Sequence, residues 1–244
     1  MSVTAPALRG PRLLRQCWCD VAFLHWAVAP DAVAGLLPPG VRPDVLDGRT
    51  YVGLVPFRMV DTGFAVGPAL PRTGTFLETN VRLYSVDGTG RRGVVFLSLD
   101  ADRAAVVAAA RTVLGLPYRW TRMSYAVDGD VRRYAARLRC PGRGTSRVAV
   151  RVGEPVPDGP LERFLTARWG LHVPRFGRTW YLPTTHRPWP LRGAELLELD
   201  DGLLAAAGLG DLAARPPDHV AFSDGVAAAF GLPVDAATPR RPSG

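Results

Sequence analysis

The stretch Thr75-Phe-Leu-Glu-Thr-Asn-Val-Arg-Leu-Tyr-Ser85 decides the fold class, because its side chains divide between two faces as they do along a β-strand. One face carries Phe76, Glu78, Asn80, Arg82 and Tyr84. The other face carries Thr75, Leu77, Thr79, Val81 and Leu83. Asp87-Gly-Thr-Gly90 follows as a hairpin signal, so the residues from Arg92 to Asp100 are predicted to form the returning strand.

Short strand-like runs recur on both sides of this hairpin. Further strands are expected at 18–28, 49–60, 117–127, 131–139, 147–153, 171–176, 179–183 and 194–199. Short helices are expected at 32–37, 103–114, 161–168 and 202–207, with a Gly/Pro-rich loop at 61–74. So many successive strands exclude an alternating βαβ fold and predict one β-rich α+β domain over residues 17–236. Residues 1–16 are expected to form a flexible arm, and residues 237–244 a disordered tail.

The composition excludes one class of mechanism. The chain has 244 residues, a formal net charge of +8, 47% hydrophobic and 21% charged residues, which are values of an ordinary globular protein. All 30 basic residues are arginine, since the sequence contains no lysine. Arginine stays protonated at working pH, so no side-chain amine is available as a nucleophile. Schiff-base chemistry on a lysine is therefore excluded.

Charge and cysteine content bear on partners and compartment. The arginines are spread along the chain in single positions and short pairs, and no zinc-finger, helix-turn-helix or RRM-type signature is present, so a nucleic-acid partner is not expected. Three cysteines argue against a disulfide framework and for a reducing compartment. No apolar run approaches the ~18 residues of a membrane span. We therefore expect a cytoplasmic protein without a membrane partner; its oligomeric state stays open.

Several motifs together resemble a known family. They are Phe-Leu-His-Trp (23–26) followed by Leu-Leu-Pro-Pro-Gly (36–40), Tyr-Val-Gly-Leu-Val-Pro-Phe (51–57), Thr-Phe-Leu-Glu-Thr-Asn-Val-Arg-Leu-Tyr (75–84), Gly-Leu-Pro-Tyr (115–118) and Gly-Arg-Thr-Trp-Tyr-Leu-Pro (177–183). In this combination the chain resembles the bacterial YqjF-like domain-of-unknown-function family, from about residue 13 to about residue 230.

That family is similar to the acetoacetate decarboxylase-like superfamily, and the resemblance implies a cone-shaped β-barrel with a few short helices. In the decarboxylases a Schiff-base lysine follows a Tyr-Pro pair at the junction of a helix and a strand. The matching stretch here is Leu116-Pro-Tyr-Arg-Trp120, with Arg119 where an amine would be needed. The resemblance therefore implies the fold but not the decarboxylase reaction.

The polar residues of the 75–85 strand form the first candidate site. Glu78, Asn80 and Arg82 share one face, and on an open sheet that face would be solvent-exposed with cross-strand charge pairs. In a small closed barrel the same face would line the interior and supply the polar groups of a ligand pocket. Burial would raise the pKa of Glu78 toward the range of a general acid or base, while Arg82 would oppose that shift.

Arg119 is the second catalytic candidate, since a guanidinium can hold a substrate carboxylate or a developing oxyanion. Strand alternation leaves open whether Arg119 or its neighbours Tyr118 and Trp120 face inward, so Tyr118 is a candidate substrate contact. The resemblance adds Arg111, which matches an arginine of the decarboxylase pattern; a structural salt bridge is the alternative. His186 lies in an expected loop and is a further candidate contact, although a structural histidine is the commoner case.

These candidates lead to two hypotheses of different classes. The first is a barrel that binds a small carboxylate or keto compound, with a lyase-, hydratase- or aldol-type reaction carried by Glu78 and Arg119. Asn80, Arg82, Tyr118, Arg111 and His186 would then contact the substrate. The second is a barrel without catalysis that binds a ligand or a protein partner. The histidines and cysteines have no metal-ligand spacing and no phosphate-binding glycine motif occurs, so no metal and no cofactor are expected.

Overall fold

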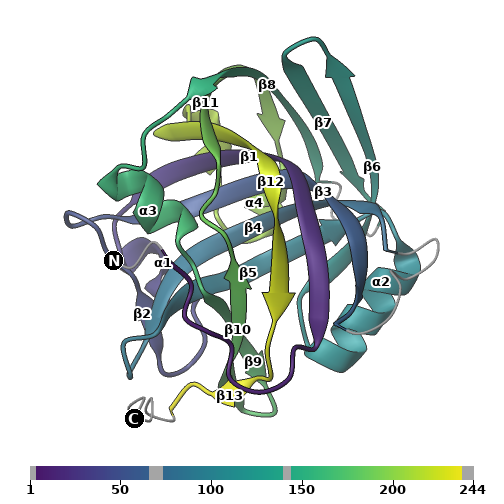
Figure 1. Ribbon diagram of the computed structural model, residues 1–244. Coiled ribbons are helices and arrows are strands. Elements are labelled where there is room, and N and C mark those ends of the chain that lie inside the picture. Colours follow the sequence, from purple (N-terminus) through teal and green to yellow (C-terminus); the bar gives the residue numbers. More distant parts are fainter. Residues whose placement is uncertain (1–3, 66–73, 140–143, 238–244) are drawn as a thin grey trace.

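The computed structural model describes residues 4–65, 74–139 and 144–237 (Figure 1). Its strands are β1 (Leu14–Val28), β2 (Val41–Pro43), β3 (Thr50–Phe64), β4 (Phe76–Asp87), β5 (Arg92–Ala101), β6 (Tyr118–Asp128), β7 (Val131–Leu138), β8 (Thr145–Pro155), β9 (Gly170–Arg175), β10 (Arg178–His186), β11 (Leu191–Asp201), β12 (His219–Phe230) and β13 (Val234–Asp235). Its helices are α1 (Asp31–Ala34), α2 (Ala104–Ala109), η1 (Ala110–Leu114), α3 (Pro160–Thr166), α4 (Leu203–Ala206) and η2 (Leu212–Ala214).

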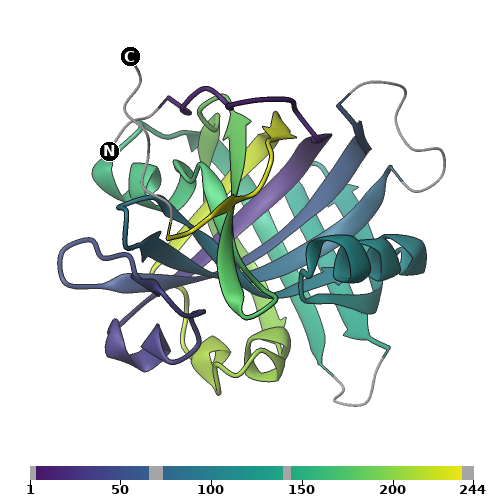
Figure 2. The same ribbon diagram turned by 90° about the horizontal axis from the view of Figure 1, so that it is seen from below.

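The strands pair into a ring that forks. Within the described residues, β1, β3, β4, β5, β9, β10 and β12 hydrogen-bond around one closed circuit. A second path leaves β5 through β6, β7, β8 and β11 and returns to β12. The strands of the shared segment therefore have a packed layer on each side. Helices lie around the outside of the strands, with α2 and α3 on opposite sides of the molecule (Figures 1 and 2).

Burial on both faces explains why the shared strands are apolar almost throughout. On β1, Val21 and Phe23 contribute to the core of the first circuit, whereas Ala22, Leu24 and Trp26 contribute to the core of the second. On β3 and β4 the two faces divide between the two cores in the same alternating way. The polar face predicted for residues 75–85 consequently points into the first circuit, and Val81 and Leu83 point into the second core.

The helix after β5 links a parallel pair of strands, with Leu99 opposite Tyr118. The helix predicted over 103–114 is present, but its second half is the π-helical turn η1, which ends at Gly115 with a φ of 68°. Short π-helical turns are rare in proteins, and those that occur are frequently found beside functional sites. No helix in the described part of the chain is long and apolar enough to cross a membrane.

The main differences from the sequence expectation are two strand boundaries and one missed strand. β1 begins at Leu14, inside the arm expected to be flexible, because Leu14 pairs with Phe230 on β12. β3 continues to Phe64, into the expected loop, and residues 66–73 of that loop lie outside the described residues.

The sequence analysis missed β12 altogether: three consecutive alanines, Asp224 and Gly225 give this segment a low strand propensity. Pairing with β1, β10 and β11 stabilises β12 instead. Of the expected tail, residues 238–244 lie outside the described residues.

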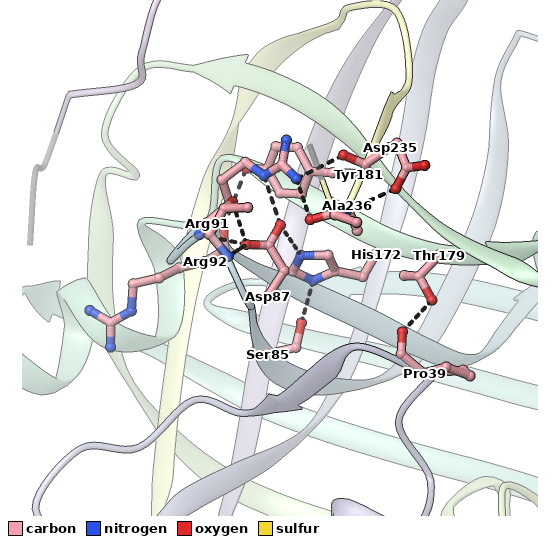
Figure 3. A network of polar contacts seen from close by, with 12 residues as sticks. Pro39, Ser85, Asp87, Arg91, Arg92, His172, Thr179, Tyr181, Asp235 and Ala236 are labelled. Atoms are coloured by element: carbon pink, nitrogen blue, oxygen red, sulfur yellow. Dashed lines mark hydrogen bonds and ion pairs between the residues drawn. The ribbon is translucent and has the colours of Figure 1, made fainter. Parts of the chain in front are cut away.

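A buried polar network holds the last strand against the β4–β5 hairpin (Figure 3). Asp87 accepts a hydrogen bond of 2.7 Å from Nε of Arg91, and Arg91 Nη2 donates to the carbonyl oxygens of Asp235 and Ala236. His172 lies between Ser85, at 2.8 Å, and Asp87, at 3.5 Å. Burial lowers the pKa of His172 to about 4 although Asp87 opposes the shift, so this histidine is neutral at pH 7.

Candidate functional site

The first circuit encloses a cavity of about 120 Å³. Its wall consists mainly of apolar side chains from β1, β3, β5, β9 and β10, including Phe23, Val55, Leu99 and Leu171. A small set of polar residues interrupts this wall: Gln16, Glu78, Asn80, Arg82, Tyr118, Thr166, Arg168, Thr184 and His186. An apolar cavity with a few convergent polar groups is the usual form of a small-molecule site.

Glu78 is the buried carboxyl group of this cavity. β4 places it in the wall, where only 3% of the residue is exposed. Its Oε2 accepts a hydrogen bond of 2.8 Å from the hydroxyl of Tyr118, the first residue of β6. Burial raises the pKa of Glu78 to about 8, the Tyr118 hydrogen bond opposes that rise, and the charge of Asp100 adds to it. Glu78 is therefore mostly protonated at pH 7, within the range of a general acid or base.

Arg82 lies two residues after Asn80 on the same strand, and its side chain is hydrogen-bonded to Tyr84. Nε and Nη2 of Arg82 donate to the Tyr84 hydroxyl at 3.1 and 2.9 Å. The Tyr84 hydroxyl in turn lies 2.7 Å from Nε2 of His25, and Nδ1 of His25 lies 3.0 Å from Nδ1 of His219. Burial lowers the pKa of His25 well below its ordinary value, and His219, Arg82 and Arg168 lower it further, so His25 is neutral.

Gly53 makes this arrangement sterically feasible. It lies between His25 on β1 and Arg82 on β4 in the strand register. A Cβ atom at Gly53 would lie 3.1 Å from Cγ of Arg82 and 3.2 Å from Cδ2 of His25. The absence of a side chain in Tyr51-Val-Gly-Leu-Val-Pro-Phe57 therefore lets the imidazole and the guanidinium approach each other.

Arg168, which follows α3, supplies a second guanidinium that the sequence analysis missed. Its Nη1 donates to Asp44 in an ion pair, and its Nε donates to the carbonyl oxygen of Phe164. Its Nη2 is buried and has no hydrogen-bond partner among the described residues. Burial lowers the pKa of Arg168 to about 10 although Asp44 opposes the shift, and Arg168 stays charged at pH 7. The one local signal was an arginine beside Trp169-Gly170, where a helix ends and a strand begins.

Asn80 and His186 complete the polar wall. Asn80 is 5% exposed, and its Oδ1 has no hydrogen-bond partner among the described residues. Nδ1 of His186 lies 2.7 Å from the carbonyl oxygen of Arg187. Burial lowers the pKa of His186, so it presents a neutral imidazole to the cavity. The structure thus brings together five residues expected in the sequence: Glu78, Asn80, Arg82, Tyr118 and His186.

The structure does not bring Arg119 and Arg111 into this group. Tyr118 faces the cavity, so strand alternation directs Arg119 to the opposite face of β6. There Nε and Nη2 of Arg119 bind the buried carboxylate of Asp100 at 2.8 and 2.7 Å. Arg111 is exposed on η1 and does not belong to the cavity wall. The geometry therefore leaves Arg82 and Arg168 as the guanidinium groups of the wall.

Two further observations limit the chemistry of the described residues. They contain no group of three or more His, Cys, Asp or Glu side chains that could hold a metal ion. Ser85, His172 and Asp87 adjoin one another, yet all three are at most 2% exposed and they lie outside the cavity wall. Since this serine does not belong to the cavity wall, we assign the cluster to the attachment of β13 (Figure 3).

Comparisons with known proteins agree with the resemblance seen in the sequence. Residues 15–227 match the model of a family described as an uncharacterized conserved protein, DUF2071. The uncharacterized protein YqjF of Bacillus subtilis (strain 168) is 31% identical over 189 residues, which cover 76% of this chain and 78% of that protein.

Solved structures with a similar fold are acetoacetate decarboxylase-like. Acetoacetate decarboxylase from Legionella pneumophila superposes with a TM-score of 0.64 at 15% identity, covering 94% of this chain and 92% of its own. The enduracididine biosynthesis enzyme MppR complexed with pyruvate gives a TM-score of 0.61 at 17% identity, covering 95% and 93%. These likenesses confirm the predicted β-rich, acetoacetate decarboxylase-like fold, whose strands form the ring described above.

Proposed function

This chain belongs to the DUF2071 family of uncharacterized conserved proteins, and from the geometry of its cavity we propose that it binds a small organic acid or keto compound there. Glu78 would serve as the proton-transfer group, and Arg82 and Arg168 would hold the negative charge. The observation that carries this proposal is the buried Glu78–Tyr118 pair in the wall of a cavity that also contains two guanidinium groups.

The size of the cavity supports a small ligand. An engineered protein cavity of about 150 Å³ holds one benzene molecule, so about 120 Å³ suits a compound in the range of roughly five to seven non-hydrogen atoms. The positive charges support an anion: Arg168 shares the carboxylate of Asp44 with Arg92, and Glu78 is mostly neutral. The similar structure of MppR was solved with pyruvate, a precedent of this size and class.

The reaction supported by these groups is enolisation. The ionised form of Glu78, roughly a tenth of the population at pH 7, would remove a proton from the carbon next to a carbonyl. The C–H electron pair would form the C=C bond, and the carbonyl π pair would move to oxygen as an enolate that a guanidinium stabilises. Glu78 would then return the proton to carbon or to a departing hydroxyl group. No step requires a lysine amine, which this chain lacks.

Hydrogen exchange at carbon tests this proposal. In D2O the protein should accelerate the replacement of the C3 protons of 2-oxobutyrate by deuterium, measured by proton NMR. Glu78→Gln should abolish the acceleration and retain binding. Glu154→Gln is the control, because Glu154 is an exposed carboxylate on β8.

Three outcomes separate the alternatives. Loss of exchange in Glu78→Gln alone supports the proposed acid–base role. Binding by the wild type without exchange supports the alternative of a ligand-binding protein without catalysis. If neither 2-oxobutyrate nor any other small acid binds at millimolar concentration, the proposed function is wrong.

A further inference from the structure

Most polar groups of the cavity either donate hydrogen bonds only or already have a partner within the chain. Arg82 and Arg168 can only donate, and Glu78 in its protonated form presents an O–H group. The acceptor oxygen of Gln16 is already occupied by Nε1 of Trp18 at 2.9 Å. The hydroxyl groups of Thr166 and Thr184 are committed to backbone carbonyl oxygens. Within the wall, the two guanidinium groups therefore call for acceptor atoms on the ligand, whereas Gln16, Thr166, Thr184, His186 and the Glu78–Tyr118 pair already have partners within the chain.

Asn80 differs from these groups because its acceptor oxygen is unpaired. It lies in the middle of the polar face, between Val55 on β3 and Leu99 on β5 in the strand register, and both neighbours are apolar cavity residues. Its Oδ1 is buried without a hydrogen-bond donor among the described residues. An unpaired buried acceptor costs stability, and this site retains one.

We propose that Asn80 determines specificity by accepting a hydrogen bond from a hydroxyl group of the ligand, so that the preferred ligand is a small hydroxy acid rather than a keto or unsubstituted acid. This inference rests on the proposed function and narrows its substrate class. The unpaired Nη2 of Arg168 offers the complementary contact, since it needs an acceptor such as the ligand carboxylate. A four-carbon hydroxy acid, with about seven non-hydrogen atoms, lies at the upper end of the size range that suits this cavity.

The strength of the preference follows from the unpaired group. A keto acid leaves the Asn80 oxygen without a donor, whereas a hydroxy acid of the same length pairs it. Such a difference corresponds to a factor of about ten in affinity. The same reasoning predicts that Asn80→Leu, which fits between Val55 and Leu99, folds at least as stably as the wild type.

Calorimetric titration with 2-hydroxybutyrate, 2-oxobutyrate and butyrate tests the inference on the wild type, Asn80→Leu and Thr50→Val. The wild type should bind one enantiomer of 2-hydroxybutyrate about ten times more tightly than the other two acids. In Asn80→Leu the ratio should fall to about one, with a melting temperature no lower than that of the wild type. Thr50→Val should keep the ratio, because the Thr50 hydroxyl is also buried without a partner among the described residues but lies outside the cavity wall.

Each outcome bears on a different claim. If the three acids bind the wild type equally, or if Asn80→Leu retains the preference for the hydroxy acid, the role of Asn80 is wrong while the organic-acid site stands. If none of the acids binds the wild type, the organic-acid site itself is wrong, and the specificity falls with it.

Discussion

The hydroxyl of Tyr118 donates a hydrogen bond of 2.8 Å to Oε2 of Glu78, and the two residues come from strands that are both neighbours of β5. Burial raises the pKa of both groups, to about 8 for Glu78 and well above its ordinary value for Tyr118. At pH 7 the pair is therefore a neutral phenol donating to a carboxyl group that is itself mostly neutral. Burial of this carboxyl group lowers the stability of the fold, and the raised pKa suits Glu78 to proton transfer.

The destabilisation caused by burying Glu78 should appear in the pH dependence of the free energy of unfolding. The folded state keeps the proton up to about pH 8, whereas the unfolded state loses it near pH 4.5, so stability falls as pH rises between these values. Glu78→Gln should match the wild type near pH 4.5 and exceed its free energy of unfolding by about 3–5 kcal/mol at pH 9. Urea denaturation at several pH values measures the difference. A difference that does not change with pH would contradict the assignment.

Tyr118→Phe should raise the pKa of Glu78 above its value of about 8, because the lost hydrogen bond favours the ionised carboxylate. The carboxyl stretching band in infrared titrations, identified by its loss in Glu78→Gln, reports the protonation of this group. Tyr125→Phe serves as a control from the same strand, since Tyr125 packs against Tyr134 in the second core. A lower Glu78 pKa in Tyr118→Phe would mean that the hydrogen bond does not act on the charged form.

Gly53→Ala should disturb the positioning of Arg82. The added Cβ would lie 3.1 Å from Cγ of Arg82 and 3.2 Å from Cδ2 of His25, so both side chains must shift. We expect a loss of about 1–3 kcal/mol in the free energy of unfolding. Weaker binding of small organic acids should accompany it, measured by denaturation and calorimetry. Gly35→Ala is the matched control, because a Cβ at that position would meet no atom within 4 Å. Equal effects of the two substitutions would refute the steric argument.

His172→Asn should flatten the loss of stability in acid. Folded His172 stays neutral down to about pH 4, whereas the unfolded histidine takes up a proton near pH 6.5, so stability falls as pH drops between these values. The wild type should lose about 3 kcal/mol from this group, and the variant none of it. The amide introduced by the substitution could still pair with Ser85, which limits the baseline cost. The gap between wild-type and variant stability, followed from pH 7 to pH 4 by thermal melting, isolates His172 from the other buried histidines; a constant gap would contradict the prediction.

The sequence was most informative for the single strand β4. Residues 75–85 alternate so regularly that the face shared by Glu78, Asn80 and Arg82 could be predicted, but the pattern left open whether this face is solvent-exposed or lines the interior, which the closed circuit of strands decides. Alternation alone could not say which of Tyr118, Arg119 and Trp120 faces inward. The parallel register of β5 and β6 decides it by placing Leu99 opposite Tyr118, and such a register depends on the whole ring.

Arg168 and β12 could not be predicted for a related reason. Arg168 reaches the cavity because α3 packs against the ring and Asp44, 124 positions away, pairs with its guanidinium. β12 is alanine-rich and owes its extended form to three partner strands. In both cases the deciding interactions join residues far apart in the chain, and no local pattern encodes them.

The closure of the ring has a consequence for synthesis of the protein. Leu14 pairs with Phe230, and Arg91 reaches the carbonyl oxygens of Asp235 and Ala236. A nascent chain that has not yet released β12 from the ribosome leaves an edge of β1 unpaired, and neither circuit is closed. The chain must therefore emerge at least as far as Phe230 before the cavity exists. Until then the incomplete sheet has an unpaired edge and is prone to associate with other chains.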